Sequence, residues 1–486
     1  MPTRKAINFQ VIIRFIGMLL MLEALFMWSG LGFSFYYGND PLPLLISGGI
    51  TFAFGGLVWL LTKNADNSNI GKREGYIIVS FTWIVISFFG ALPFLISGYI
   101  PGITDAFFET MSGFTTTGAS ILRDIEIVPR DILFWRSMTH WIGGMGIIVL
   151  TLAILPMLGI GGMQLFVAEV PGPTPDKLHP RITGTAKRLW GIYVLLTLVQ
   201  TVLLLFGGMD LHESLCHTFG TMATGGFSTR NASVAAYSPY IQYVIIFFMF
   251  LAGMNFTLHY FALKGKLKTV WKNEEFRYYL FLMVIISLII AAVLVIKSDK
   301  GIETAIRDSL FQVVSITTTT GFVTSDYLLW PGYLWFLLFL LFFTGGCAGS
   351  TGGGIKVIRQ LLLFKNSRLE LRRLVHPQAV LPVKLNGKSV SQDIIFNILA
   401  FYLIYMLIFA FGTAIMTVLG LDFQTSIGSV AATLGNIGPG IGDVGPVCNY
   451  ADMPDAGKWF LSFFMLLGRL ELFTVLILFS FAFWKK

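Results

Sequence analysis

The sequence predicts an all-α integral membrane protein with ten membrane spans, in which an N-terminal helical hairpin precedes four pseudo-symmetric repeats of span, pore loop and span around one pore. Three observations predict this fold class. The 486 residues are 55% apolar and only 12% charged, whereas about 25% of residues are charged in soluble domains. Ten apolar segments have roughly the 20 residues that a helix needs to cross a bilayer. A motif rich in Thr and Gly recurs four times along the chain.

This composition excludes soluble enzymes and disordered chains, because the apolar residues exceed what a water-soluble core can bury. The three cysteines, Cys216, Cys347 and Cys448, lie far apart and form no Cys-x-x-Cys pair, so we expect neither a disulfide framework nor a zinc site. The net charge of +8 does not point to nucleic acid as a partner, because the distribution of charge matters more than its sum in a membrane protein.

The spans follow one another along the chain with Trp or Tyr at several of their ends, as expected at the membrane interface. The predicted spans are residues 11–36, 42–61, 76–95, 138–158, 190–208, 240–261, 278–296, 330–344, 394–419 and 459–484. Basic residues concentrate in alternate loops, which by the positive-inside rule places both termini in the cytoplasm. We therefore expect a multi-pass protein of a bacterial-type inner membrane, surrounded by lipid.

The repeats divide the chain into five parts. These are the two-span hairpin (1–70), the first repeat (71–165), the second repeat (166–270), the third repeat with an intramembrane gating loop and a cytosolic linker (271–388), and the fourth repeat (389–486).

Each outer loop after the hairpin contains about ten moderately apolar residues that end in a Thr- or Gly-rich motif, here called a knot. The first to fourth knots are residues 114–120, 222–228, 318–323 and 435–440. A single knot of this kind could simply end a helix or let two helices pack closely. Four knots, each between two spans and at a nearly fixed period, indicate a repeated architecture.

The knots have a chemical rationale. A helix of ten residues is about 15 Å long and reaches halfway through a bilayer, and irregular backbone at that depth must be buried in protein or line water. Four half-length helices that aim their negative C-terminal ends at one axis would stabilise a dehydrated cation. The knot carbonyls would then replace its hydration shell, and glycine tolerates the dihedral angles that turn carbonyls inward.

With these motifs the chain resembles the Trk/Ktr/HKT superfamily of potassium transporters over nearly its whole length, and the hairpin at residues 11–61 is similar to that of the TrkH-type pore-forming subunit. The resemblance implies potassium uptake through a selective pore, driven by the electrochemical gradient, rather than enzymatic catalysis. The K⁺ ion would be the transported species, and no organic cofactor is implied. The implied partners are a second copy of the chain, in a homodimer, and a cytosolic nucleotide-binding regulatory subunit of the TrkA type.

The predicted potassium-binding filter takes three residues from each knot. These are Thr116, Thr117, Gly118, Ala223, Thr224, Gly225, Thr319, Thr320, Gly321, Asn436, Ile437 and Gly438. In plant relatives, Ser in place of the first filter glycine accompanies sodium selectivity, so the glycines at all four positions imply selectivity for potassium. Asn436 and Ile437 depart from the threonine pattern and supply carbonyls without a threonine hydroxyl.

Residues 345–354, here called the glycine-rich loop, contain six glycines. These are Gly345, Gly346, Gly349, Gly352, Gly353 and Gly354. Each Gly weakens a helix interior by about 1 kcal/mol relative to Ala, so we expect the eighth span to break here; close helix packing is the alternative. In the resembled family, a loop at this place gates the pore.

Arg469 lies inside the last predicted span, where a charge usually faces the bundle interior or water. We expect it to face the pore, to contact the glycine-rich loop and to repel cations in the closed pore. The alternative is a structural ion pair with Glu471, but a spacing of two residues puts these side chains on different helix faces.

Two other functions are compatible with parts of the sequence. An ion-coupled secondary transporter of a solute would also use broken helices, usually in inverted repeats. The segment Gly440-Ile441-Gly442-Asp443 matches an intramembrane aspartyl protease signature, but that chemistry needs a second Asp in a neighbouring span, and none of the predicted spans contains Asp. Four scattered histidines lack the spacing of metal ligands and are expected to do ordinary packing or interfacial work: His140, His212, His217 and His259.

Overall fold

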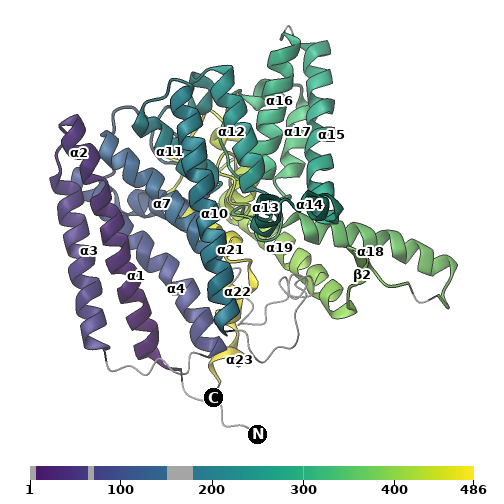
Figure 1. The fold of residues 1–486 in the computed structure, drawn as a ribbon, viewed down its shortest axis with the longest axis horizontal. Coiled ribbons are helices and arrows are strands. Elements are labelled where there is room, and N and C mark those ends of the chain that lie inside the picture. The colour runs from purple at the N-terminus through teal and green to yellow at the C-terminus, as the bar shows by residue number, and fades with distance from the viewer. Residues whose placement is uncertain (1–6, 64–70, 150–178, 299, 380, 486) are drawn as a thin grey trace.

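The computed structural model describes residues 7–63, 71–149, 179–298, 300–379 and 381–485 (Figure 1). These residues are mostly helical, as predicted. Among them, six helices are long and apolar enough to cross a membrane, or up to eight spans if each of two bent helix pairs counts as one.

The N-terminal hairpin consists of α1 (Phe9–Ser29), its continuation α2 (Leu31–Tyr37) and α3 (Leu42–Leu61). Helices α1 and α3 lie side by side at one edge of the molecule (Figure 1). Their close approach depends on Gly17 and Gly55, because a Cβ atom on Gly17 would lie 2.9 Å from the carbonyl oxygen of Gly55. Small residues at a helix crossing allow this backbone proximity in membranes.

The segment after the hairpin contains α4 (Lys72–Gly90), α5 (Leu92–Ser97), α6 (Ile103–Phe114) and α7 (Arg130–Val149). The next contains α10 (His179–Phe206), α11 (Leu211–Met222), η3 (Ser233–Ala236), α12 (Pro239–Ala252), α13 (Phe256–Leu263) and α14 (Leu267–Lys272).

The third segment contains α15 (Glu274–Lys297), α16 (Ile302–Thr317), η4 (Tyr327–Leu329), α17 (Gly332–Leu341) and α18 (Val357–Val375). Strands β1 (Lys384–Leu385) and β2 (Lys388–Ser389) form an antiparallel hairpin, in which Lys384 pairs with Ser389. The last segment contains α19 (Gln392–Val418), α20 (Phe423–Leu434), η5 (Gly442–Val444), α21 (Asp455–Arg469), α22 (Phe473–Leu476), η6 (Ile477–Phe479) and α23 (Phe481–Trp484).

Four short helices, α6, α11, α16 and α20, end directly at the four knots. They have 12, 12, 16 and 12 residues, so each is only about 18 to 24 Å long. Their C-terminal halves are buried between the longer helices, whose outer surfaces remain exposed. Each knot therefore lies inside the molecule, at the end of a helix too short to cross a bilayer.

Two predicted spans are not continuous helices. The predicted span 240–261 bends by 104° between α12 and α13, and the predicted span 459–484 bends by 110° after Arg469. At the first bend, the side-chain oxygen of Asn255 accepts a hydrogen bond from the Thr257 N–H and so starts a new helix. At the second, Glu471 and Leu472 have φ angles of 58° and 52°, which no helix accommodates.

Two further predicted spans differ in length. The predicted span 138–158 begins earlier, at Arg130, and its residues 150–158 lie outside the described part of the chain. The predicted span 330–344 contains only the ten-residue helix α17, after which the chain enters the glycine-rich loop, as expected from its glycine content.

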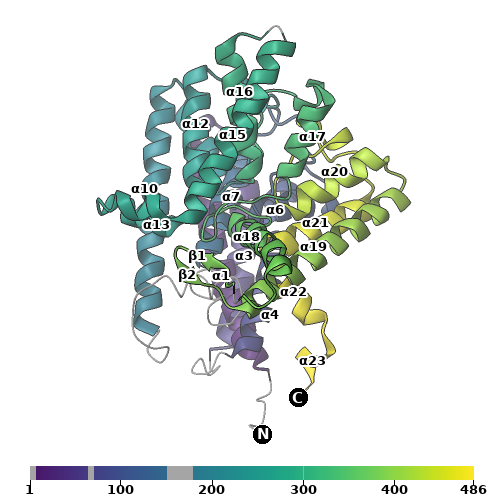
Figure 2. The same cartoon turned by 90° about the vertical axis from the view of Figure 1, so that its right-hand side faces the viewer.

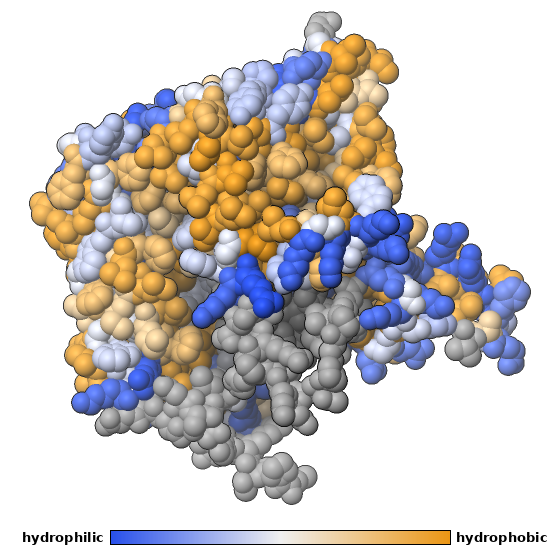
Figure 3. Space-filling model, viewed as in Figure 1, coloured by the Kyte–Doolittle hydropathy of each residue, from blue (hydrophilic) through white to orange (hydrophobic). Residues whose placement is uncertain are grey.

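The outer face of the bundle is apolar, as a lipid-facing surface should be. Figure 3 shows a face dominated by apolar side chains, with hydrophilic residues gathered over the projecting helix α18. On α19, large apolar side chains such as Phe396, Leu403 and Phe411 are exposed. Figure 2 shows α19, α20 and α21 together on one side of the molecule and α10 and α12 on the other.

Candidate functional site

The four knots share one backbone conformation. At the second position after each short helix, a residue other than glycine adopts a left-handed φ. These residues are Thr116 (52°), Thr224 (56°), Thr319 (59°) and Asn436 (54°). Two residues later, a glycine does the same: Gly118 (81°), Gly226 (79°), Gly321 (80°) and Gly438 (95°). Such strain persists only where the surroundings impose it, and it is commonest at functional sites.

The same hydrogen bond closes each knot onto its short helix. In each case a knot N–H donates to a carbonyl five residues earlier, in the short helix. The donor and acceptor residues are Thr117 and Ser112 (2.8 Å), Gly225 and Gly220 (2.7 Å), Thr320 and Ser315 (2.8 Å), and Ile437 and Ala432 (2.8 Å). The recurrence of one geometry at four separate places in the chain is the structural counterpart of the recurring motif.

The knots meet in a closed ring. A Cβ atom added to the positive-φ glycine of each knot would lie very close to a carbonyl oxygen of the next knot. The glycines, the neighbouring carbonyls and the distances are Gly118 and Gly225 (2.0 Å), Gly226 and Thr320 (2.0 Å), Gly321 and Ile437 (2.0 Å), and Gly438 and Thr117 (2.6 Å). Each knot thus lies against the next, and the fourth returns to the first. Only glycine leaves room for the neighbouring carbonyl at these positions.

The register of the second knot differs by one residue from the predicted register. Gly226, not Gly225, has the φ and the neighbour contact of Gly118, and Thr224 corresponds to Thr116. Ala223 instead occupies the helix-end position of Thr115. Matching Gly226-Phe227 with Gly321-Phe322 would have found this register in the sequence.

The place where two neighbouring knots meet is here called a joint. A different set of hydrogen bonds stabilises each joint of the ring. The joint between the first and second knots is bridged by His140, which sequence reasoning assigned to ordinary packing. At the next joint, the Val234 N–H donates to the Val323 carbonyl at 3.1 Å. The Tyr327 hydroxyl donates to the Gly440 carbonyl at 2.6 Å between the third and fourth knots.

Asn436 closes the ring at the joint between the fourth and first knots. Its amide nitrogen donates to the Thr117 hydroxyl and to the Met465 carbonyl, both at 2.9 Å. In the first knot, the Thr115 and Thr117 hydroxyls are already paired with each other at 2.8 Å. The departure from threonine at position 436 therefore supplies a cross-link that a threonine side chain is too short to make.

The glycine-rich loop lies against three of the knots. Its start and end are held together by the Gly345 N–H, which donates to the Ile355 carbonyl at 2.7 Å. In its middle, the Thr351 hydroxyl donates to the Met222 carbonyl at 2.9 Å, and the Gly353 N–H donates to the Thr319 hydroxyl at 2.7 Å. A Cβ atom on Gly354 would lie 3.0 Å from the carbonyl oxygen of Gly435.

Arg469 is the last residue of α21 and is only 2% exposed. Its guanidinium donates to the Thr351 carbonyl at 2.6 Å and to the Gly143 carbonyl at 3.0 Å. It thereby connects the glycine-rich loop to α7, and the contact with the loop that we expected from the sequence is present. Glu471 pairs with Arg359, at 2.5 Å, and not with Arg469.

Two further contacts of the glycine-rich loop had no sequence signal. The Lys356 ammonium group, buried at the start of α18, donates to the Gly352 carbonyl. The Glu275 carboxylate accepts a hydrogen bond from the Ala348 N–H at 2.7 Å. Neither residue was among the predicted site residues.

Acidic residues of the outer loops have structural partners. Glu109 pairs with Arg136 at 2.7 Å, and Asp105 pairs with Lys458 at 2.6 Å. Asp422 caps α20, and hydrogen bonds from Thr425 lower the pKa of its carboxyl group below the ordinary value. Asp443 lies in η5, after the fourth knot.

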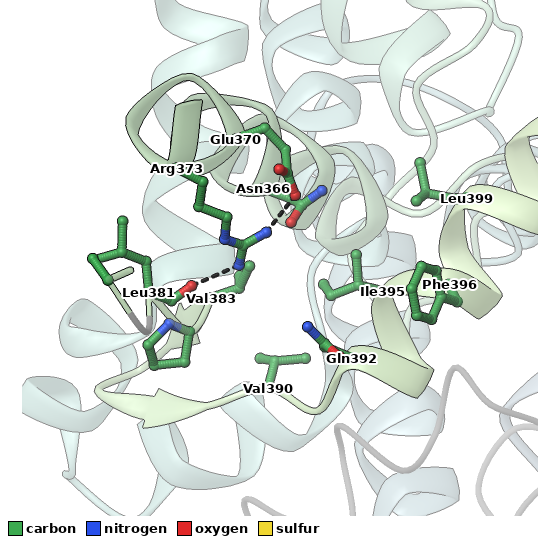
Figure 4. A pocket seen from close by; sticks show the side chains of 12 residues that line it. Asn366, Glu370, Arg373, Leu381, Val383, Val390, Gln392, Ile395, Phe396 and Leu399 are labelled. Carbon is green, nitrogen blue, oxygen red and sulfur yellow. Dashed lines mark hydrogen bonds and ion pairs between the residues drawn. The ribbon is translucent and has the colours of Figure 1, made fainter. Parts of the chain in front are cut away.

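A pocket of about 480 Å³ lies away from the knots, between α18, the β1–β2 hairpin and the start of α19. Figure 4 shows Arg373 at its wall, where its guanidinium bonds with the Glu370 carboxylate and the Leu381 carbonyl. None of the knot residues lines this pocket.

The chain is similar to known proteins over its whole length. Residues 44–486 match the family TrkH, described as cation transport protein. The chain is 43% identical over 488 residues to the Trk system potassium uptake protein TrkH of Escherichia coli K12, covering 99% of this chain and 100% of that protein. It is 36% identical to TrkG of the same organism, covering 98% and 99%.

Its fold is also similar to a solved structure. The crystal structure of the potassium transporter TrkH from Vibrio parahaemolyticus aligns with a TM-score of 0.90 at 39% identity, covering 99% of this chain and 100% of that one.

Proposed function

Because this chain belongs to the TrkH family of cation transport proteins, we propose that it forms the transmembrane pore of a potassium uptake system and that the ring of knots is its selectivity filter. As a member of a transporter family, it is not an enzyme. The observation that supports the filter assignment is the closed ring, in which four knots share one conformation and a glycine of each knot lies against a backbone carbonyl of the next.

The ring suits a dehydrated monovalent cation. Carbonyl oxygens replace water ligands without bringing a full negative charge, and the four short helices end at the ring with their negative poles. The filter residues are those predicted in the first, third and fourth knots, together with Thr224, Gly225 and Gly226 in the second. The inside-negative potential draws K⁺ inward with about 2.3 kcal/mol per charge per 100 mV.

We propose four repeats of span, pore loop and span after the hairpin, with ten crossings in all. Each bent pair, α12–α13 and α21–α22, is one crossing, and α7 and the α17–loop–α18 segment supply the others. The conformational identity of the four knots and the short helix before each one support this division of the chain.

The glycine-rich loop is the gate in this proposal. It contacts the second, third and fourth knots, and Arg469 bonds it to α7. A cation leaving the filter would meet both the loop and the guanidinium charge, so conduction requires the loop to move.

The chain acts as a homodimer in an inner membrane, with a cytosolic nucleotide-binding regulator of the TrkA type. The resemblance to the Trk systems carries this part of the proposal. Helix α18 projects from the bundle and exposes Leu371, Leu374 and Val375 together with basic residues, which suits contact with another protein. Cross-linking of the purified protein in detergent, followed by mass measurement, tests the dimer; a single-chain mass throughout contradicts it.

The filter is tested by rubidium-86 uptake into proteoliposomes, with competition by K⁺, Na⁺ and Li⁺. We expect K⁺ to compete far better than Na⁺ with the wild-type chain. Gly118→Ser should relax this preference, because the added Cβ must displace the Gly225 carbonyl of the adjacent knot. The matched control is Gly32→Ser, since a Cβ on Gly32 meets nothing within 4 Å.

Each outcome bears on the filter. Equal competition by K⁺ and Na⁺ in the wild type, or an unchanged preference in a folded Gly118→Ser variant, would contradict the assignment. No cation uptake even after deletion of residues 345–354 would contradict the pore itself and favour a solute transporter.

A further inference from the structure

Helix α7 places Arg136 and His140 one turn apart, at the joint between the first and second knots. Both side chains are buried, with 2% and 0% exposure. The ring of Phe227, which follows Gly226 in the second knot, packs against both. The Arg136 guanidinium carbon is 3.5 Å from its centroid, and the His140 ring stacks on it with centroids 4.0 Å apart.

His140 forms hydrogen bonds with the end of α6, directly before the first knot, and with the second knot at once. Its Nδ1 lies 2.7 Å from the carbonyl oxygen of Gly113, and its Nε2 lies 3.2 Å from the backbone nitrogen of Phe227. A carbonyl can only accept and an N–H can only donate. The imidazole is therefore neutral, with its proton on Nδ1 and a lone pair on Nε2.

Both hydrogen bonds end at groups that fix the filter conformation. The Gly113 carbonyl also accepts the N–H of Thr116, at 3.0 Å, and Thr116 is the residue with the strained φ in the first knot. On the other side, a Cβ on Gly225 would lie 2.5 Å from the His140 ring, so the imidazole packs directly on the second knot.

The other repeats carry no histidine at the corresponding place. A Cβ on Gly143 would lie 2.0 Å from the carbonyl of Phe114, and a Cβ on Gly468 would lie 2.1 Å from the carbonyl of Leu434. Phe114 and Leu434 are the last residues of α6 and α20, so Gly143 and Gly468 occupy equivalent positions. His140 and Met465, each three residues earlier, therefore correspond. The Tyr193 hydroxyl donates to the Trp141 carbonyl, and the Tyr279 hydroxyl donates to the Phe250 carbonyl in the same way. Trp141 and Phe250 are thus equivalent, and the residues before them, His140 and Met249, correspond as well. Both methionines are fully buried.

We propose that His140 is a positioning residue for ion selectivity, which fixes the spacing of the first and second knots by bonding to Gly113 and Phe227. This inference rests on the proposed function of the ring. The joint between the first and second knots has no counterpart of the Asn436 cross-link, which fastens the fourth knot to the first. Without His140, Arg136 would still link α6 to the second knot through Glu109 and the Ser228 carbonyl. The Gly113 carbonyl and the Phe227 N–H would lose their shared partner, so the carbonyls at this joint would adjust more readily to a smaller cation.

The test is the ratio of the K⁺ and Na⁺ inhibition constants for rubidium-86 uptake, measured in proteoliposomes with three variants. His140→Met introduces the residue of the corresponding positions and removes both hydrogen bonds. His140→Asn keeps a donor near the Nδ1 position, and His140→Gln keeps an acceptor near the Nε2 position. His259→Met is the matched control, because His259 is also buried and, among the described residues, its ring hydrogen-bonds to the Leu251 carbonyl, in α12, and to no knot residue.

We expect His140→Met to reduce the potassium preference about five- to thirtyfold, the factors that correspond to one or two hydrogen bonds of about 1 kcal/mol. The Asn and Gln variants should lie between it and the wild type, and the maximal uptake rate should fall less than the preference. The control should keep the wild-type ratio.

The outcomes separate the inference from the proposed function. A wild-type ratio in a folded His140→Met variant, or an equal loss in His259→Met, overturns the role of His140 and leaves the filter intact. If His140→Met does not fold, wild-type ratios in both the Asn and Gln variants overturn it. A wild-type protein without cation uptake overturns the filter and this inference together.

Discussion

At the scale of single residues, Arg469 acts as a latch, by which we mean that its guanidinium bonds the glycine-rich loop to α7. A buried guanidinium must be hydrogen-bonded to be tolerated, and its two backbone acceptors belong to the glycine-rich loop and to α7. Its charge therefore stabilises the loop in its position against the knots.

We expect Arg469→Ala to raise uptake in the absence of a regulator, because the loop loses a charged hydrogen bond of about 1.5 to 3 kcal/mol. This corresponds to roughly a ten- to hundredfold shift towards the open loop. Rubidium-86 uptake by the purified chain measures it. Arg123→Ala serves as the control, since Arg123 is an exposed arginine paired with Asp452. Unchanged uptake in Arg469→Ala would contradict the latch.

Single residues also show what a sequence can and cannot predict. The glycines at 118, 321 and 438 were predictable, because one backbone conformation imposes one residue type wherever it recurs. The register at Gly226 was not predicted, since Gly225 beside it is also glycine; the positive φ and the contact with Thr320 identify Gly226, and in the sequence the only sign was the Phe that follows both Gly226 and Gly321. The role of His140 depends on two segments far apart in the chain and leaves no local pattern.

At the scale of secondary-structure elements, the helical, membrane-like character of the chain followed from hydropathy, whereas the bends did not. The count of ten spans stays a prediction, because the described residues contain six helices long and apolar enough to cross a membrane, or up to eight spans if each bent pair counts as one. A hydropathy window detects composition, but the bend after α21 depends on a tertiary ion pair. The chain leaves α21 with two left-handed residues, and Glu471 at this turn reaches Arg359 on α18. The pair thus fastens the C-terminal end of the chain to the first turn of the helix that follows the glycine-rich loop.

We expect Glu471→Gln to destabilise the folded protein by about 3 to 5 kcal/mol, because it leaves Arg359 buried without a countercharge. The double variant Arg359→Met, Glu471→Gln should recover most of that loss. Thermal unfolding in detergent of the wild type, both single variants and the double variant measures the interaction energy between Arg359 and Glu471. Additive effects of the two substitutions would show that the pair does not hold α18 to the turn. The exposed pair Arg123–Asp452 is the control, for which a coupling of less than about 1 kcal/mol is expected.

At the scale of the whole molecule, the orientation in the membrane determines the direction of transport. The positive-inside pattern predicts that the knots open to the outside and that both termini lie in the cytoplasm. The chain carries its own reporter of this orientation, because Cys448 is exposed in the loop after the fourth knot, whereas Cys216 and Cys347 are buried.

A membrane-impermeant maleimide should therefore label Cys448 in right-side-out vesicles and leave inside-out vesicles unlabelled. Partial burial, together with the charges of Asp443 and Asp326, raises the pKa of the Cys448 thiol. Since the thiolate is the reactive form, labelling should accelerate as the pH rises and should need a higher pH than a fully exposed thiol. Cys448→Ser should abolish it, and Lys485→Cys in that background should be labelled only in inside-out vesicles. The reverse pattern would invert the orientation, and labelling of both positions from one side would contradict a single crossing between the fourth knot and the C-terminus.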